Sequence, residues 1–162
     1  MRLTVIFTLI AALVSSCAEP VNSPAKEQTV STVSAEDKDV SQMGICIDIN
    51  GTQLTATLAD TTAAEELAQR LGDEPVTVTL DEYGGFEKVG MLPWSLTASD
   101  RRTDTSPCDI MLYQGNSMTI FYDRNSWSYT RLGRIDNVTA DELKSILGEG
   151  SVTITLSLAE QQ

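Results

Sequence analysis

Alternation of apolar and polar residues on both sides of an Asn-Gly pair is the feature that most limits how this chain can fold. Isoleucines alternate with Cys46 and Asp48 over residues 45–49, and apolar residues alternate with glutamine and threonine over residues 53–58. Period-two alternation indicates half-buried strands, and Asn50-Gly51 between them is typical of a two-residue hairpin turn. The pattern therefore predicts an antiparallel hairpin with Cys46 on the face opposite the isoleucines.

Further strands are indicated along the rest of the chain. Alternation or short apolar runs bounded by turn residues occur at residues 75–80, 109–113, 118–122, 132–135 and 152–158. Gly115-Asn116 separates two of these segments and predicts a second hairpin. The total is about seven or eight strands.

Two short helices complete the pattern. Residues 62–65 and 139–142 both have the capping-box form, threonine followed three residues later by glutamate, and Gly72 and Gly148 are the expected ends of the helices. Many half-buried strands with only two helices favour a mainly β fold, an antiparallel barrel capped at its ends. We place this domain at residues 43–162.

The N-terminal residues predict a lipid anchor. A short positive start and an apolar run of about a dozen residues precede Cys17. This apolar run is too short for a spanning helix, which needs roughly 20 residues. This arrangement resembles a bacterial lipoprotein signal with its lipobox, with a signal peptide at residues 1–16 and the lipid on Cys17. Residues 17–42 are polar and contain no aromatic residue, which is typical of a disordered tether. The expected location is the bacterial cell envelope.

Composition excludes several classes of function. The formal charge is -12 without a basic cluster, so nucleic acid is not an expected partner. The chain contains no histidine, which excludes a Ser-His-Asp or Cys-His mechanism and removes the commonest nitrogen ligand for zinc. No EF-hand pattern and no phosphate-binding glycine loop occurs. We expect no cofactor and no metal.

Two cysteines remain once Cys17 is assigned to lipid. Outside the cytosol, Cys46 and Cys108 form a disulfide if their Cβ atoms come within about 4 Å, and they are free thiols otherwise. The sequence leaves both alternatives open. A redox-active pair is the weakest interpretation, because the two lack Cys-x-x-Cys spacing.

Several blocks of sequence resemble one family. They are Ile-Asn-Gly-Thr at 49–52, Tyr-Gly-Gly-Phe-Glu-Lys at 83–88, Leu-Pro at 92–93, and the segments 109–113, 115–116, 120–122 and 132–135. In this order they resemble the small bacterial cyclophilin-like domain family, which implies a closed eight-stranded β-barrel with two helices. Family members often carry Gly-Asp and Pro-Trp-Gly where this chain has Cys108-Asp109 and residues 114–116.

The resemblance also suggests a specific activity, that of a prolyl isomerase. Such an enzyme holds the twisted amide in an apolar pocket with an arginine beside it, and needs no acid, base or metal. Larger cyclophilins present this arginine in a Phe-His-Arg stretch, which is absent here, so no catalytic residue is transferred. Arg134 is the arginine to examine, either as an anchor in a pocket or as half of a structural ion pair.

Most of the aromatic residues gather between positions 83 and 129. Trp94 and Trp127 lie in polar, loop-like segments, where an exposed indole is a candidate contact for a ligand. Glu87-Lys88 is interpreted either as part of the pocket mouth or as a solvated charge pair. The polar run 100–104 predicts a surface loop. The candidate pocket consists of Tyr83, Glu87, Trp94, Tyr113, Phe121, Tyr122 and Arg134.

These observations predict a membrane-anchored extracytoplasmic lipoprotein whose cyclophilin-like domain binds an unidentified peptide, protein or small ligand without chemistry of its own. The alternative is a peptidyl-prolyl isomerase or folding helper for exported proteins. Acceleration of prolyl exchange would distinguish the two.

Overall fold

The structure is a computed structural model that describes residues 43–159. The predicted signal peptide, Cys17 and the predicted tether lie outside the described residues. Within residues 43–159, no helix combines the length and the apolar character needed to cross a membrane.

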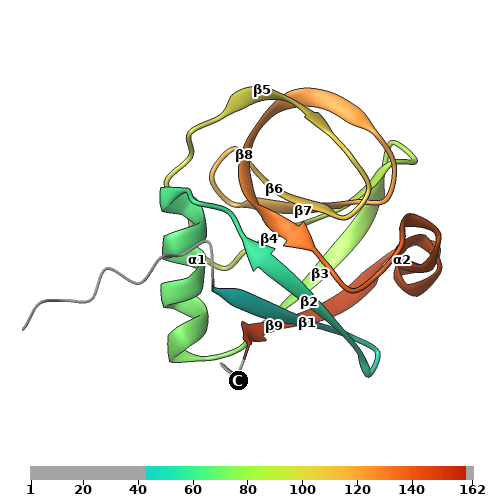
Figure 1. Ribbon diagram of the computed structural model, residues 1–162, viewed down its shortest axis with the longest axis horizontal. Helices are drawn as coiled ribbons and strands as arrows, with labels where there is room; N and C mark the ends of the chain where they lie inside the picture. The colour runs from blue at the N-terminus through green and yellow to red at the C-terminus, as the bar shows by residue number, and fades with distance from the viewer. Residues whose placement is uncertain (1–42, 160–162) are drawn as a thin grey trace, which may run out of the picture. The chain divides into compact units, whose positions relative to one another are not determined.

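Eight antiparallel strands close into a barrel, which confirms the predicted fold class, although β4 was not among the segments predicted from alternation (Figure 1). The order around the barrel is β2-β1-β9-β3-β4-β7-β6-β8, and pairing of β2 with β8 closes it. The strands are β1 (Gly44–Ile49), β2 (Thr52–Leu58), β3 (Val76–Tyr83), β4 (Glu87–Met91), β6 (Asp109–Tyr113), β7 (Ser117–Phe121), β8 (Asn125–Ile135) and β9 (Val152–Leu158). A ninth strand, β5 (Arg101–Thr105), pairs only with β8.

Both predicted hairpins are confirmed. β1 pairs with β2 across Asn50-Gly51, with Ile49 opposite Thr52. Asn50 and Gly51 have φ values of 52° and 84°, the left-handed backbone that an Asn-Gly turn between twisted strands requires. β6 pairs with β7 in the same way, with Tyr113 opposite Ser117.

Both predicted helices are present, but the predicted ends of the first are wrong, whereas those of the second are confirmed. Helix α1 spans Thr62–Asp73, and its N-cap is Thr61, whose side chain accepts from the backbone N–H of Ala64. The capping residue therefore lies one position earlier than predicted, and Gly72 does not end the helix. Helix α2 spans Ala140–Leu147 with the predicted capping box of Thr139 and Glu142, and Gly148 is its C-cap.

The run that predicted a surface loop forms a strand instead. Residues 101–105 are β5, which pairs with the first half of β8, where Arg101 lies opposite Tyr129. The loop assigned around Trp127 is also wrong, because Trp127 belongs to β8. In β8 the register against β6 shifts between Ile110 and Met111, a bulge that helps the long strand bend. β5 and the first half of β8 form the arch at the top of Figure 1.

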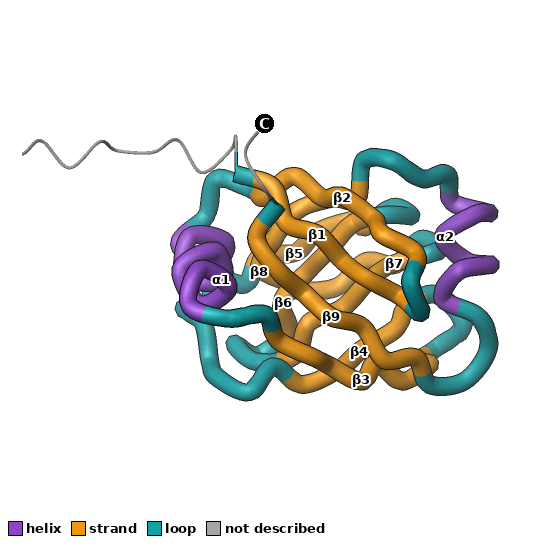
Figure 2. The backbone as a smooth tube through the Cα atoms, turned by 90° about the horizontal axis from the view of Figure 1, so that it is seen from below, coloured by secondary structure: helices purple, strands orange, loops and turns teal. Residues whose placement is uncertain are grey.

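The domain contains two hydrophobic clusters. The larger one fills the barrel with aliphatic residues from the strands, and it includes Leu67 of α1 and Leu143 of α2. The helices lie at opposite sides of the strands (Figure 2). The smaller cluster is formed by Met111, Phe121 and Tyr129. Since Ile110 and Ile120 belong to the larger cluster while Met111 and Phe121 belong to the smaller, strands β6 and β7 are buried on both faces.

Candidate functional site

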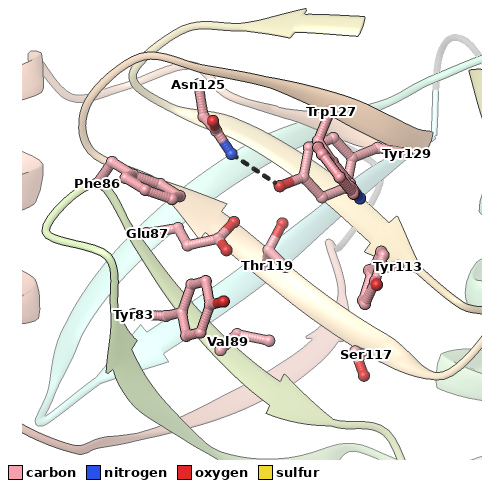
Figure 3. Close-up of a pocket in the computed structure, with 10 residues that line it drawn as sticks. All are labelled: Tyr83, Phe86, Glu87, Val89, Tyr113, Ser117, Thr119, Asn125, Trp127 and Tyr129. Atoms are coloured by element: carbon pink, nitrogen blue, oxygen red, sulfur yellow. Dashed lines mark hydrogen bonds between the residues drawn. The ribbon is translucent and has the colours of Figure 1, made fainter. Parts of the chain in front are cut away.

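A pocket of about 480 Å³ lies on the outer face of the barrel, beneath the arch (Figure 3). Its floor comes from β4, β6 and β7, and its roof comes from the first half of β8. The lining residues are Tyr83, Phe86, Glu87, Val89, Tyr113, Ser117, Thr119, Asn125, Trp127 and Tyr129. This volume is in the range that holds a small ligand.

Aromatic rings connect the two sides of the pocket. The ring of Tyr83 packs edge-on against Phe86, and Phe86 stacks on Phe121 with their centroids 6.4 Å apart. Phe121 and then Tyr113 each pack against the ring of Tyr129, at centroid distances of 5.4 and 6.1 Å. Such edge-to-face contacts fix ring positions beyond what burial alone provides. The wall is therefore apolar and held in place.

Glu87 is the one charged side chain among the lining residues. It is 4% exposed, and its Oε2 is buried without a hydrogen-bond partner. Burial raises the pKa of its carboxyl to about 7, although a hydrogen bond with the Tyr129 hydroxyl opposes the rise, so the unpartnered atom is Oε2 and not the whole carboxyl. In Figure 3 the carboxylate points into the space between Tyr83, Phe86 and Thr119. An unpaired polar atom in a protein interior is unfavourable, so a polar oxygen aimed into a pocket indicates a missing partner.

The neighbouring residue Lys88 points to the opposite face of β4. It pairs with Ile120 of the main cluster and is fully buried. Its Nζ donates to the carbonyl oxygen of Gly150 at 2.5 Å and lies 2.8 Å from Oε2 of Glu82. Neither Glu87 nor Lys88 is solvated, so the interpretation of the two as a surface charge pair is wrong.

Comparison with known proteins identifies the fold. The family model described as the cyclophilin-like family matches residues 47–157. The chain belongs to this family. The domain is also similar to the solution structure of a hypothetical protein from Archaeoglobus fulgidus, with a TM-score of 0.53 and 14% identity over 76% of this chain and 99% of that one. No curated protein matches the chain.

In this cyclophilin-like domain the structure brings together three of the predicted pocket residues, Tyr83, Glu87 and Tyr113. The other four lie elsewhere. Phe121 is fully buried behind the wall, and Trp94 packs against the main cluster instead of presenting an exposed indole. Tyr122 lies in a separate polar depression, where its hydroxyl donates to Glu82.

Arg134 is half of an ion pair and not a pocket anchor. Its Nη1 lies 2.8 Å from Oδ1 of Asp109, a buried carboxylate that also accepts from Arg131 at 3.1 Å. Its side chain is 51% exposed. The structural alternative raised for Arg134 is therefore confirmed.

Sequence reasoning did not assign seven of the lining residues to the pocket: Phe86, Val89, Ser117, Thr119, Asn125, Trp127 and Tyr129. Val89, Ser117 and Thr119 share the outer face of β4 and β7, where Val89 pairs with Thr119. Their alternation with Lys88, Met118 and Ile120 is the signal that places them together once these strands are known to pair. No comparable local signal indicates that β8 folds over this face.

Cys46 and Cys108 are free in the structure, so the disulfide alternative is not realised. Cys46 faces away from the isoleucines of β1, whereas Cys108 belongs to the barrel cluster and donates to the carbonyl oxygen of Val138. Their side chains thus lie on opposite sides of the barrel wall. Cys108 has φ = 74°, a left-handed value that favours glycine.

The described residues contain no group of three or more Cys, Asp or Glu side chains placed to hold a metal ion. What the pocket offers chemically is one carboxyl with an unpartnered oxygen, aromatic faces, and the polar groups of Ser117, Thr119 and Asn125. Asn125 is already engaged, since its Nδ2 donates to the Tyr129 hydroxyl at 3.0 Å.

Proposed function

We propose that this domain is a binding module and that the pocket around Glu87 is its ligand site. The observation that carries the proposal is the buried, unpartnered Oε2 of Glu87 inside an aromatic pocket. Elsewhere in the described part of the chain, each buried side-chain nitrogen or oxygen has a hydrogen-bond partner. Structural packing therefore leaves this one group unsatisfied, and a ligand would satisfy it.

We propose further that the module is displayed at a bacterial membrane by a lipid on Cys17. The support is the sequence alone, with its positive start, short apolar run and small residues before the cysteine. A polar segment between Cys17 and the barrel suits a tether that holds a binding domain away from lipid headgroups.

The isomerase alternative has less support in the site geometry. Arginine is absent from the lining residues, and Arg134 is engaged by Asp109. We therefore favour binding without chemistry. Exchange NMR on Xaa-Pro peptides tests this directly, and acceleration of cis/trans exchange by the full chain would overturn the preference for binding alone.

The binding proposal is tested with a pair of substitutions on β4. Val89 lines the pocket, whereas Met91, two residues later, is 69% exposed and lies outside the lining. Val89→Phe fills the pocket, and Met91→Phe adds the same ring outside it. A survey of small molecules and peptides, read by ligand-induced NMR shifts, should find ligands that lose binding to Val89→Phe and keep binding to Met91→Phe. Ligands that bind both variants equally would refute the site.

The anchor is tested separately. Cys17→Ser should leave the protein unlipidated and release it from washed membranes. A Cys46→Ser variant is the matched control and should stay membrane-bound. If mass spectrometry finds Cys17 without lipid in the unsubstituted protein, the anchor proposal is wrong.

A further inference from the structure

The charge in the pocket is not balanced by any basic side chain among the lining residues. Glu87 supplies a carboxyl, and no lysine, arginine or histidine is among the lining residues to neutralise it. Lys88 follows it in sequence but is turned into the barrel and is engaged there by Glu82 and Gly150. The chain as a whole carries a formal charge of -12. An anionic ligand would thus meet only repulsion, whereas a cation would complete the site.

The walls of the pocket are mainly aromatic. The rings of Tyr83, Phe86, Tyr113, Trp127 and Tyr129 line the pocket around the carboxyl. Trp127 and Tyr83 are 55% and 60% exposed, so both are accessible to a ligand at the mouth. The faces of aromatic rings attract cations, and they also pack well against alkyl groups. A carboxylate within an aromatic enclosure suits an ammonium ion that carries apolar substituents.

We propose that the Glu87 pocket binds an alkylammonium group, primary or methylated, with its nitrogen against the Glu87 carboxylate and its alkyl carbons against the rings of Trp127 and the neighbouring tyrosines. This inference rests on the proposed function, because it assigns a ligand class to the same site.

The protonation of Glu87 gives the inference a signature. Burial raises the pKa of Glu87 to about 7, so the carboxylate that a cation requires forms as the pH rises through 7. A bound cation favours the charged form, so alkylammonium affinity should increase about tenfold from pH 6 to pH 8. A ligand that accepts a hydrogen bond from the neutral carboxyl, such as a peptide amide, should show the reverse.

The other titratable groups that face Glu87 are phenols. They are Tyr83 of β3, Tyr113 of β6 and Tyr129 of β8. Burial raises the pKa of Tyr129 to about 12. The change expected between pH 6 and pH 8 therefore belongs to Glu87.

The test titrates the full chain with choline and with its uncharged isostere 3,3-dimethylbutanol. The chain has two tryptophans, so two indole N–H signals report in an NMR spectrum: Trp127 in the pocket and Trp94 against the main cluster as an internal control. Choline should shift the Trp127 signal and leave the Trp94 signal in place, and 3,3-dimethylbutanol should bind at least about tenfold more weakly.

Two substitutions isolate the carboxylate. Glu87→Gln keeps the shape of the side chain, and it should weaken choline binding at pH 8 at least about tenfold and abolish the pH dependence. Asp104→Asn makes the same change of charge on the exposed face of β5 and should leave binding unchanged. Butylamine and Nα-acetyl-lysine amide extend the test to free and peptide-borne amines, and tighter binding of either one supports an alkylammonium site and shows which source suits it.

The inference and the proposed function fail differently. Equal binding of choline and 3,3-dimethylbutanol, no binding of choline, butylamine or Nα-acetyl-lysine amide, or full binding by Glu87→Gln would each overturn the alkylammonium inference. The pocket would still stand as a ligand site if another compound lost its binding to Val89→Phe but not to Met91→Phe.

Discussion

Glu87 and Lys88 are consecutive buried charged residues on β4, and they lie in opposite environments. Lys88 points into the barrel and has two partners, the carbonyl oxygen of Gly150 and the carboxylate of Glu82. Glu87 points to the outer face, where its Oε2 has none. Burial alone therefore does not distinguish structure from function. Lys88 has structural partners inside the barrel, whereas the unpartnered oxygen of Glu87 is the basis of the proposed ligand site.

Among these substitutions, the largest effect on stability should come from replacing Lys88, whose polar contacts are all made inside the protein. Lys88→Ala removes a fully buried side chain and both of its polar contacts, and it should lower the free energy of unfolding by about 3 kcal/mol. Urea unfolding followed by circular dichroism measures this. Lys88→Met restores most of the volume and should lose about 1 kcal/mol, because Glu82 is 38% exposed and water can replace its partner. Equal loss in both variants would show that the charge and not the packing is what matters.

Replacing Glu87 should have the opposite effect on the free energy of unfolding: Glu87→Gln should stabilise the domain. In the folded protein the pKa of Glu87 is raised to about 7 from its ordinary 4.5, so the folded state keeps a proton that the unfolded state releases. Stability is therefore lost as the pH rises from about 4.5 to 7 and is constant above that. Glu87→Gln should be more stable than the unsubstituted chain by about 2 kcal/mol at pH 8, with allowance for solvent at the pocket mouth, and equal to it near pH 4.

Unfolding curves at pH 4, 6 and 8 check this second prediction. Asp104→Asn serves as the control for a lost surface charge and should show no such gain. A Glu87→Gln variant that is less stable at pH 8 would mean that the carboxylate has a structural partner after all.

The two tryptophans extend the same comparison. Trp94 packs against the main cluster, so Trp94→Ala should cost about 2 kcal/mol. Trp127 is 55% exposed at the pocket mouth, so Trp127→Ala should change stability by less than about 0.5 kcal/mol while weakening choline binding. Thermal unfolding and the choline titration separate the two effects. If Trp127→Ala lost as much stability as Trp94→Ala, Trp127 would be part of the packed core and not an exposed residue at the pocket mouth.

The smallest predicted effect concerns the thiols on the two sides of the barrel wall. Cys108 is 4% exposed and burial raises its pKa, whereas Cys46 is partly exposed on the outer face of β1. In the folded, reduced chain Cys46 should react with iodoacetamide at least about tenfold faster than Cys108. Peptide mass spectrometry distinguishes the sites, and comparable rates would place Cys108 in a more open environment than the structure shows.

Local patterns were enough to predict the strands and turns whose two faces differ. Alternation identified β9, and the Asn50-Gly51 pair identified the first hairpin. β5 was missed because four of its five residues are not buried, which leaves no alternation to detect. The unexpected burial of Glu87 has a similar cause, since it depends on the arch of β8, roughly forty residues later in the chain.

Long-range packing also explains the incomplete prediction of the pocket. The aromatic residues were recognised as a group, but composition did not reveal that Phe121 lies behind the wall and Trp127 at the mouth. In the sequence, Arg134 is a cation between apolar neighbours, which is a pattern that a pocket anchor and a structural ion pair share. Its partner Asp109 belongs to a different strand, β6, which pairs with β8 at that position.

An NMR titration of the Glu87 side-chain carboxyl carbon in the full chain, with and without choline, tests the proposed site at its central residue. Glu87 in the free protein should titrate with a pKa of about 7, and saturating choline should lower this pKa. Titration of Glu87 near its ordinary value of 4.5, unchanged by choline, would contradict both the burial of this carboxyl and the proposed site around it.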